Sequence, residues 1–133
     1  VTELLEKDFS PLDLELTVQE CLNEVLNSRK NIFPVLDKSQ RFHGLIYSEL
    51  LLEEALHIKN NTSNKTTIKD IMQPPVESAK LNTPLYEIMQ KMERTNIRTI
   101  PIINDEGLFL GFITKNAIFN SYRKELNKEL DYL

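Results

Sequence analysis

The stretch NIRTIPIINDEGLFLGFIT, residues 96–114, decides the fold, because an altered copy of it, NIFPVLDKSQRFHGLIY, occupies residues 31–47. Each stretch reads as a short polar start, an apolar strand, a polar turn and a second apolar strand. A shift of 67 residues, which places Pro34 on Pro101, aligns the chain with itself without a gap over residues 14–51. The chain is therefore a tandem duplication. One copy alone would expose apolar surface that two facing copies can bury together.

Both copies are predicted to contain the same elements. The residues at 18, 21, 22 and 25 are apolar with the spacing of a helix stripe, and the shift carries them onto apolar residues of the second copy. We expect a first helix at 17–29 and 84–95, a strand at 32–36 and 99–103, a second strand ending near 46 and 113, and a second helix at 48–57 and from 115 to at least 126.

Cap residues support the starts of the two first helices. Thr17 and Glu20 have the spacing of a capping box, and Thr83 before Pro84 predicts a capped helix with proline at its first position. Cys21 lies on the apolar stripe, so we expect it to be buried and unreactive.

Composition restricts the class of protein. Of 133 residues, 41% are hydrophobic and 27% charged, as in an ordinary globular domain. The net charge of −4 gives no reason to expect a nucleic-acid partner. No apolar run approaches the roughly 20 residues that cross a bilayer, and a single cysteine fits a reducing cytosol. The start at Val1 rather than Met suggests a piece of a longer protein.

The order of these motifs resembles a known family. DIMQPPV, then a helix, then NIRTIPIINDEGLFLGFITKNAI is similar to the second half of a CBS-domain pair, also called a Bateman module, and NIFPVLDKSQRFHGLIYSELL is similar to the first half. The resemblance covers residues 8–125. It implies an α/β (α+β) fold of two β-α-β-β-α units, related by a pseudo-twofold axis and packed through their sheets.

Within that family, LLEKDFSPLDLELTVQECL, FPVLD and SYRKEL are most similar to the cytosolic tails of CLC chloride channels and transporters. This resemblance implies a regulatory module that follows a transmembrane transport domain of the same polypeptide, at the cytosolic face of the plasma (inner) membrane. It also implies a homodimer and ATP, ADP or AMP as ligand, with no cofactor required.

The expected organisation follows from the repeat. Residues 1–7 form a connecting segment, 8–60 the first unit, 61–75 a linker and lead-in, 76–126 the second unit and 127–133 a C-terminal tail. The stripe of Ile118, Tyr122 and Leu126 on the last helix is a candidate dimer contact, or it packs against the first copy.

The resemblance also implies a ligand site between the halves. In the family, a Gly–apolar–apolar–Thr/Ser segment leads into the second helix, whose unpaired N–H groups favour phosphate. An acidic residue three positions after the Thr/Ser holds the ribose hydroxyls. In the second copy, GFITKNA supplies Thr114 and Lys115 as phosphate contacts but places Ala117 at the acidic position. Asn116 points about 100° away around the helix and is a poor replacement.

The first copy departs further from that pattern. GLIYSEL places Tyr47 at the hydroxyl position and Leu50 at the acidic one, so Tyr47 would stack on a base or close the cleft, and Ser48 would cap the helix or contact phosphate. Loss of one charge-assisted hydrogen bond weakens binding by about ten- to a hundredfold. Arg98 stands where the family often has a basic residue, and the backbone of Val76 to Ala79 is the expected adenine contact.

Each of these candidates has a plainer structural role. Thr114 is an N-cap by residue type, Arg98 a strand-edge arginine, Lys115 a solvated lysine, and the backbone at 76–79 a strand edge.

Catalysis and metal binding are not expected. Glu49, Glu53 and His57 share one helix face, but a solvated acidic face explains them better than a metal site. No catalytic triad, phosphate-binding glycine loop or zinc spacing is visible, so the chain is not expected to be an enzyme on its own.

Three functions stay open on the sequence. The first is the nucleotide-sensing module of a chloride channel or transporter. The second is a structural dimerisation module without a ligand, which the missing acids favour. The third is a regulatory insert of a soluble enzyme, as in nucleotide-synthesising dehydrogenases that carry CBS pairs.

Overall fold

The computed structural model describes residues 2–60 and 65–130, and its chain divides into two compact units. The first-copy unit contains Asp8–Pro75 and Glu106–Phe109. The second-copy unit contains Val1–Lys7, Val76–Asp105 and Leu110–Leu133. Each unit has its own apolar core.

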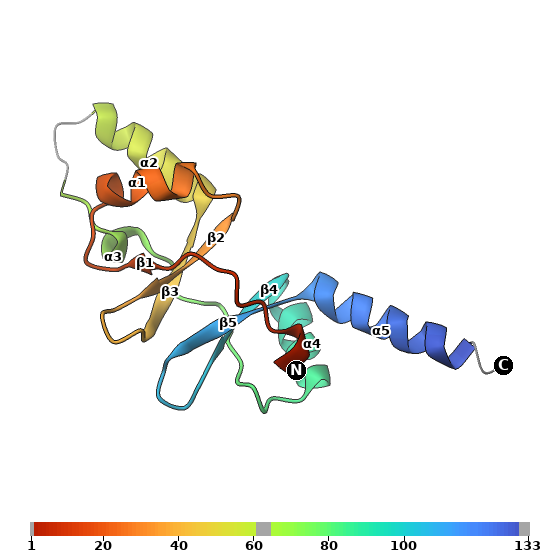
Figure 1. The fold of residues 1–133 in the computed structure, drawn as a ribbon. Helices are drawn as coiled ribbons and strands as arrows, with labels where there is room; N and C mark the ends of the chain where they lie inside the picture. The colour runs from red at the N-terminus through yellow and green to blue at the C-terminus, as the bar shows by residue number, and fades with distance from the viewer. Residues whose placement is uncertain (1, 61–64, 131–133) are drawn as a thin grey trace. The chain divides into compact units, whose positions relative to one another are not determined.

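The first-copy unit is a small sheet with helices packed on it (Figure 1). Its hydrophobic core joins α1, α2 and α3 to the strands, and α1 packs against α2. Fully buried members of this core include Val18 on α1, Phe33 on β2 and Ile68 on α3. Its elements are β1 (Leu12–Asp13), α1 (Val18–Leu26), β2 (Ile32–Leu36), β3 (Phe42–Tyr47), α2 (Ser48–Asn60) and α3 (Ile68–Ile71).

Hydrogen bonds fix the register of this sheet. Strand β1 pairs with β2 in parallel, with Leu12 opposite Val35, and β2 pairs with β3 antiparallel. Asp37 organises the turn between β2 and β3, because its Oδ1 accepts the backbone N–H groups of Ser39 (2.8 Å) and Arg41 (3.0 Å). The hairpin therefore has its turn at the end of β2 and its open end at the start of α2.

The second-copy unit repeats this plan. A short 3₁₀ helix, η1 (Thr2–Leu4), is followed by α4 (Leu85–Thr95), β4 (Thr99–Ile103), β5 (Phe109–Thr114) and α5 (Lys115–Leu130). Strands β4 and β5 form a two-stranded sheet, and Ala79 bridges Ile102 in parallel beside it. Helix α4 ends at Asn96, which adopts the left-handed conformation (φ 56°) that closes many helices.

The 67-residue repeat is present in the pairing as well as in the sequence. The parallel pair of Leu12 and Val35 becomes the pair of Ala79 and Ile102 after the shift. The antiparallel bridge of Leu45 and Gln73 corresponds to that of Phe112 and Glu6. The predicted tandem duplication and the mixed α/β class are thereby confirmed.

These bridges divide the chain differently from the sequence-based boundaries. Glu6 precedes the first copy but pairs with β5, and Leu4 and Leu5 pack against the second core, so the segment at 1–7 is built into the second-copy unit. Residues 65–75, expected in a linker, form part of the first-copy unit through α3 and the bridge at Gln73. Residues 127–130 continue α5 rather than forming a tail. Positions 61–64 and 131–133 lie outside the described residues.

Two backbone hydrogen bonds, which the 67-residue repeat relates to each other, join the tips of the two hairpins within the first-copy unit. The N–H of Phe42 donates to the carbonyl of Gly107 (2.9 Å), and the N–H of Phe109 donates to the carbonyl of Gln40 (3.3 Å). The shift by 67 residues exchanges these two hydrogen bonds. The ring of Phe109 lies 5.4 Å from that of Phe42 and 4.6 Å from that of Phe9, so the contact also has an aromatic core.

One of the two predicted helix caps is correct. The capping box of Thr17 and Glu20 is complete in both directions. The predicted cap at Thr83 is wrong, because its hydroxyl accepts the N–H of Lys80 (3.0 Å), and α4 begins at Leu85 after Pro84. Cys21 is buried as expected, and burial raises the pKa of its thiol to about 11.

The helices also bear on the expected cellular location. Among residues 2–60 and 65–130, no helix combines the length and the apolar character that spanning a bilayer requires. Helix α5 has 16 residues and carries charged side chains at its first position and over its second half. The expectation that this chain is part of an integral membrane protein at the plasma membrane is therefore wrong.

Candidate ligand-binding site

The strongest candidate sites are the two places where a second strand runs directly into a second helix. Strand β3 ends at Tyr47 and α2 begins at Ser48; strand β5 ends at Thr114 and α5 begins at Lys115. The N–H of Ser48 donates to the carbonyl of Asn31 (2.9 Å), and the N–H of Lys115 donates to the carbonyl of Arg98, also at 2.9 Å. Since the 67-residue shift carries one hydrogen bond onto the other, the two helix starts are geometric equivalents.

At the start of α2, the structure brings Tyr47 and Ser48 together in a recess of about 300 Å³. Asn31 and Glu49 form the rest of its lining, and Tyr47 is 42% exposed there. Neither Asn31 nor Glu49 was predicted. The 67-residue shift places Asn31 on Arg98, which was a predicted site residue, so the repeat could have identified Asn31 as a candidate.

At the start of α5, three polar residues meet, but their side chains have partners in the protein. The Thr114 hydroxyl accepts the N–H of Ala117 (3.1 Å), which is the capping role expected from its residue type. Arg98 Nη2 donates to Asn116 Oδ1 at 3.4 Å, so the guanidinium lies over the first turn of α5. Lys115 Nζ lies 5.8 Å from the centroid of the Phe119 ring, one turn further along the helix.

The segment proposed to contact adenine has few free backbone groups. The N–H of Ala79 donates to Pro101 (3.1 Å), and its carbonyl accepts the N–H of Ile103 (3.0 Å). The carbonyl of Ser78 accepts Lys91 Nζ (3.0 Å). Ala79 is buried, whereas Val76 is 68% exposed. Val76 is therefore better placed than Ala79 for a ligand contact.

Glu77 holds this segment against α4. Its carboxylate accepts Lys91 Nζ at 3.2 Å and Arg94 Nη2 at 3.4 Å. Burial raises the pKa of Glu77, but the hydrogen bond and positive charge of Lys91 outweigh burial and leave the pKa below its usual value. The contacts of Glu77 with Lys91 and Arg94 hold the segment that leads to Ala79.

The family's acidic positions contain apolar residues in the structure. Leu50 is half-buried on α2, and the N–H of Ala117 is used by the cap at Thr114. Asn116 is engaged by Arg98. The residues at these positions therefore provide no carboxylate for a ribose.

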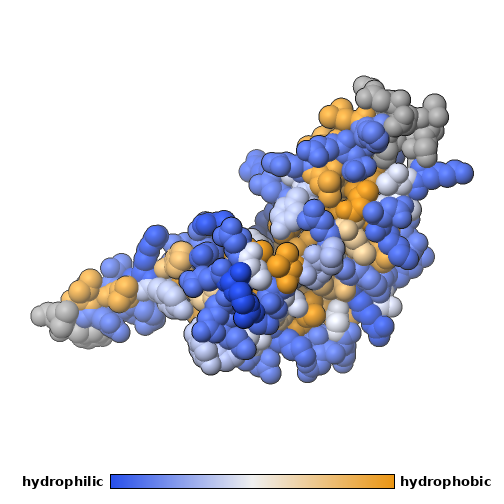
Figure 2. Space-filling model, turned by 180° about the vertical axis from the view of Figure 1, so that it is seen from behind, coloured by the Kyte–Doolittle hydropathy of each residue, from blue (hydrophilic) through white to orange (hydrophobic). Residues whose placement is uncertain are grey.

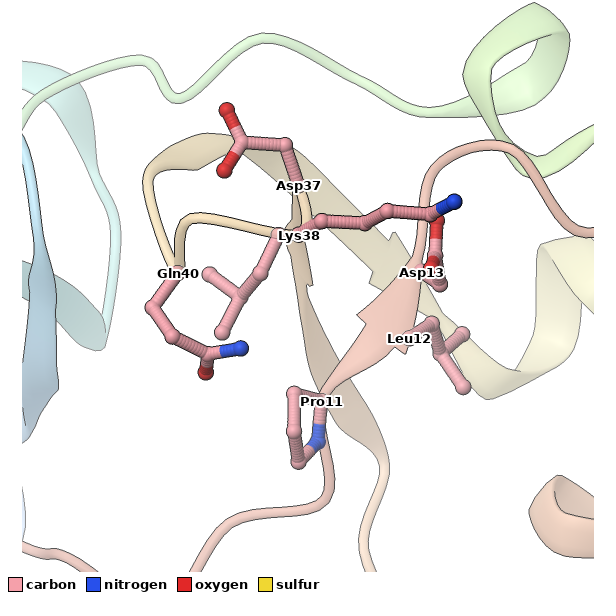
Figure 3. A pocket seen from close by; sticks show the side chains of 7 residues that line it. Pro11, Leu12, Asp13, Asp37, Lys38 and Gln40 are labelled. Atoms are coloured by element: carbon pink, nitrogen blue, oxygen red, sulfur yellow. The ribbon is translucent and has the colours of Figure 1, made fainter.

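A second recess lies at the opposite end of the first-copy sheet, next to the β2–β3 turn (Figure 3). Its volume is about 340 Å³. Asp37, one of its walls, also contacts His43 Nε2 through Oδ2 (2.8 Å); this hydrogen bond, with that of the Arg41 N–H, holds the Asp37 pKa below its usual value. Both carboxylate oxygens of Asp37 therefore already have hydrogen-bond partners in or next to the turn. The lining residues are Pro11, Leu12, Asp13, Leu36, Asp37, Lys38 and Gln40.

No metal centre forms within residues 2–60 and 65–130, where no group of three or more His, Cys, Asp or Glu side chains could hold an ion. Glu49, Glu53 and His57 therefore do not converge on one point.

Comparisons with known proteins agree with the fold. The sequence model of the CBS domain matches residues 68–124. A CBS domain protein of Streptococcus pneumoniae TIGR4 superposes with a TM-score of 0.78 at 17% identity, covering 94% of this chain and 87% of that one. The cytosolic domain of the Mg²⁺ channel MgtE in complex with ATP superposes with a TM-score of 0.72 at 19% identity, covering 89% of this chain and 46% of that one.

Curated relatives are similar at low identity. A homoserine O-acetyltransferase of Methanobrevibacter ruminantium is 22% identical over 89% of this chain and 23% of its own length. Cyclic di-AMP receptor B of Bacillus subtilis is 27% identical over 73% of this chain and 64% of its own length. The chain spans about a quarter of the length of the first relatives.

None of the proteins named here is a chloride channel, so the narrower subfamily resemblance gains no support from them. The match of the CBS domain supports a CBS unit at residues 68–124, and the two solved neighbours, at 17% and 19% identity, show a shared fold.

Proposed function

We propose that this chain is a regulatory module that binds an adenine nucleotide and transmits its occupancy to another domain or subunit. The observation that carries the proposal is the pair of equivalent helix starts, one of which gathers Arg98 and Lys115 around the first turn of α5. A helix start with two neighbouring cations is suited to phosphate, because the positive end of the helix dipole and positive side chains favour an anion.

The similar proteins supply the class of ligand. One neighbour was solved with ATP, and one relative is a receptor of cyclic di-AMP. Both ligands contain adenine and phosphate. A nucleotide that binds one conformation of the module better than another would shift the population toward it.

The partner in this proposal is a catalytic domain of an enzyme. Several similar proteins have enzyme names and are about four times as long as the matched region. The module would then act as a regulatory insert or appendage.

Titration calorimetry with ATP, ADP and AMP tests the ligand. We expect binding that Arg98→Ala weakens by about tenfold, because a charge-assisted hydrogen bond to phosphate is removed. Arg123→Ala, on the later part of α5, is the matched control and should bind like the wild type. No heat and no shift in melting temperature at millimolar nucleotide would contradict the proposal.

A second candidate function is dimerisation without a ligand. Leu50 and Ala117 at the acidic positions favour it, as does the apolar surface of α5 (Figure 2). Ile118, part of the predicted contact stripe, is buried in the core of its own unit. The face proposed for a second copy is therefore formed by side chains that are 37–62% exposed: Phe119, Tyr122, Leu126 and Leu130.

A further inference from the structure

The recess next to the β2–β3 turn has a counterpart in the second-copy unit with exchanged charges. Its lining of about 340 Å³ includes Asp13 at the end of β1 and Lys38 just after β2 (Figure 3). The 67-residue shift places these two residues on Lys80 and Asp105, which line a recess of about 160 Å³. An acid in one copy therefore corresponds to a base in the other, at both positions.

In the second-copy unit the two charges bind each other. Lys80 Nζ donates a hydrogen bond to Asp105 Oδ1 and forms an ion pair with it. This hydrogen bond and the positive charge of Lys80 hold the pKa of Asp105 below its usual value. The smaller recess is therefore already neutralised by its own side chains.

In the first-copy unit the corresponding charges stay available. Within residues 2–60 and 65–130, Asp13 and Lys38 form no ion pair, although Figure 3 shows the Lys38 side chain extended toward Asp13. Asp13 Oδ1 accepts the backbone N–H of Glu15 (2.9 Å), which holds the carboxylate at the end of β1. Lys38 is exposed. One carboxylate oxygen and one ammonium can thus both reach a small ligand.

The signs of the charges decide the class of ligand. A ligand with only negative charge would be repelled by Asp13 and by Asp37, which also lines the recess. A ligand with only positive charge would be repelled by Lys38. A zwitterion can place its ammonium on Asp13 and its carboxylate on Lys38, and it then gains a charge-assisted hydrogen bond at each end.

The remaining lining restricts the size and polarity of the ligand. Leu12 and Leu36 are buried, and Pro11 lies beside them. Strands β1 and β2 are parallel, so their carboxyl ends meet at this edge of the sheet and place both charges on one side of these apolar residues. The volume of about 340 Å³ lies near the lower limit of typical small-ligand pockets, roughly 300–1,000 Å³. These features suit a short, uncharged side chain.

We propose that this recess binds a free α-amino acid with a short uncharged side chain, held by Asp13 through its ammonium and by Lys38 through its carboxylate. The site lies at the turn end of the first-copy hairpin, whereas α2 begins at the open end. It would give the module a second class of ligand besides the proposed nucleotide.

An NMR titration of the full chain with L-valine tests the site. Since exposed charge pairs contribute little each, we expect a Kd of about 1 mM or weaker. The amides of 11–13 and 36–40 should shift, while those of 80–82 and 104–105, around the self-paired recess, should stay in place. Isobutylamine and isovalerate, which each keep one of the two charges of valine, should bind at least about threefold more weakly.

Two variants test the assigned roles. Asp13→Asn keeps an oxygen for the N–H of Glu15, and Lys38→Gln changes an exposed side chain, so both should keep the wild-type melting temperature. Each should weaken L-valine by about two- to fivefold, because one charge pair is lost. Glu15→Gln, at an exposed acid outside the lining, is the matched control and should bind like the wild type.

Three results would overturn the proposal. The first is no shift at 11–13 and 36–40 with L-valine at tens of millimolar. The second is binding of isobutylamine or isovalerate as tight as that of L-valine, which would show a site for a single charge. The third is wild-type affinity in both Asp13→Asn and Lys38→Gln. None of these results bears on nucleotide binding, which is followed at other amides.

Discussion

Gly111 on β5 lies where the backbone of another segment passes too close for a side chain. A Cβ there would lie 2.5 Å from the carbonyl oxygen of Glu6, and its φ of +150° is rarely adopted by other residues. Gly107 is a suitable comparison, because its φ is +83° but no atom lies within 4 Å of a Cβ built on it.

We predict that Gly111→Ala destabilises the protein by about 2–4 kcal/mol, since either β5 or the segment at Glu6 must move. Gly107→Ala should cost about 1 kcal/mol, from backbone strain alone. Urea denaturation followed by circular dichroism measures both values. Equal losses would show that Glu6 does not pack on β5 as described.

Asp37 leads to a prediction about pH. Its pKa is lowered by the hydrogen bond with His43 and by the N–H of Arg41, so ionised Asp37 stabilises the folded state. A lowered folded-state pKa means that this contribution is present at neutral pH and is lost as the pH falls below the usual aspartate value of about 3.9.

The variant Asp37→Asn should therefore be less stable than the wild type at pH 6, and the difference should shrink as the pH approaches 3. Thermal melts of both proteins across that range provide the measurement. A difference that stays constant with pH would rule out a contribution from the charge of Asp37.

Individual residues were predicted from sequence where a local hydrogen bond decides their role. The capping box of Thr17 and Glu20 needs only its own turn, and it forms as predicted. Thr83 has a competing donor in Lys80, which only the folded turn reveals. Glu49 was considered only as a metal ligand, because its place in the recess depends on where Asn31 and Tyr47 lie.

At the scale of elements, the paired hairpin tips form a contact within the first-copy unit. Phe109 is 8% exposed and packs on Phe9 and Phe42, whereas Phe119 on α5 is 37% exposed. Phe109→Ala should lower the free energy of unfolding by about 3–5 kcal/mol, because it removes a buried ring and leaves a cavity.

Phe119→Ala is the matched control and should cost about 1 kcal/mol or less. Denaturant titration of both variants separates these values. A loss at Phe109 no larger than that at Phe119 would mean that the tip contact contributes little to stability.

The longer elements could be predicted because their periodic patterns extend over many residues. The main helices and the two hairpins were all predicted, with differences at their ends. The two-residue β1 and the isolated bridges of Glu6 and Gln73 were missed, because so short a pairing leaves no alternation of apolar and polar residues to detect.

At the scale of the whole molecule, the exposed apolar face of α5 is the basis of the proposed homodimer. Leu126 is 57% exposed and lies between Tyr122 and Leu130 on that face. Leu126→Glu should convert a dimer into a monomer, since it places a charge in an apolar contact.

Lys124→Glu, on a different face of the same helix, should leave the dimer intact. Light scattering coupled to size-exclusion chromatography measures the mass of each. A wild type that is monomeric at all concentrations, or a Leu126→Glu variant that stays dimeric, would contradict the use of this face.

Nucleotide binding at the helix starts is the central claim, and an NMR titration of the full chain with AMP tests it most directly. The account predicts that amides of residues 98 and 114–117 shift with increasing AMP, while those of 11–13 and 36–40, around the recess of Figure 3, stay in place. Shifts confined to the recess at 36–40, or no shift at millimolar AMP, would contradict it.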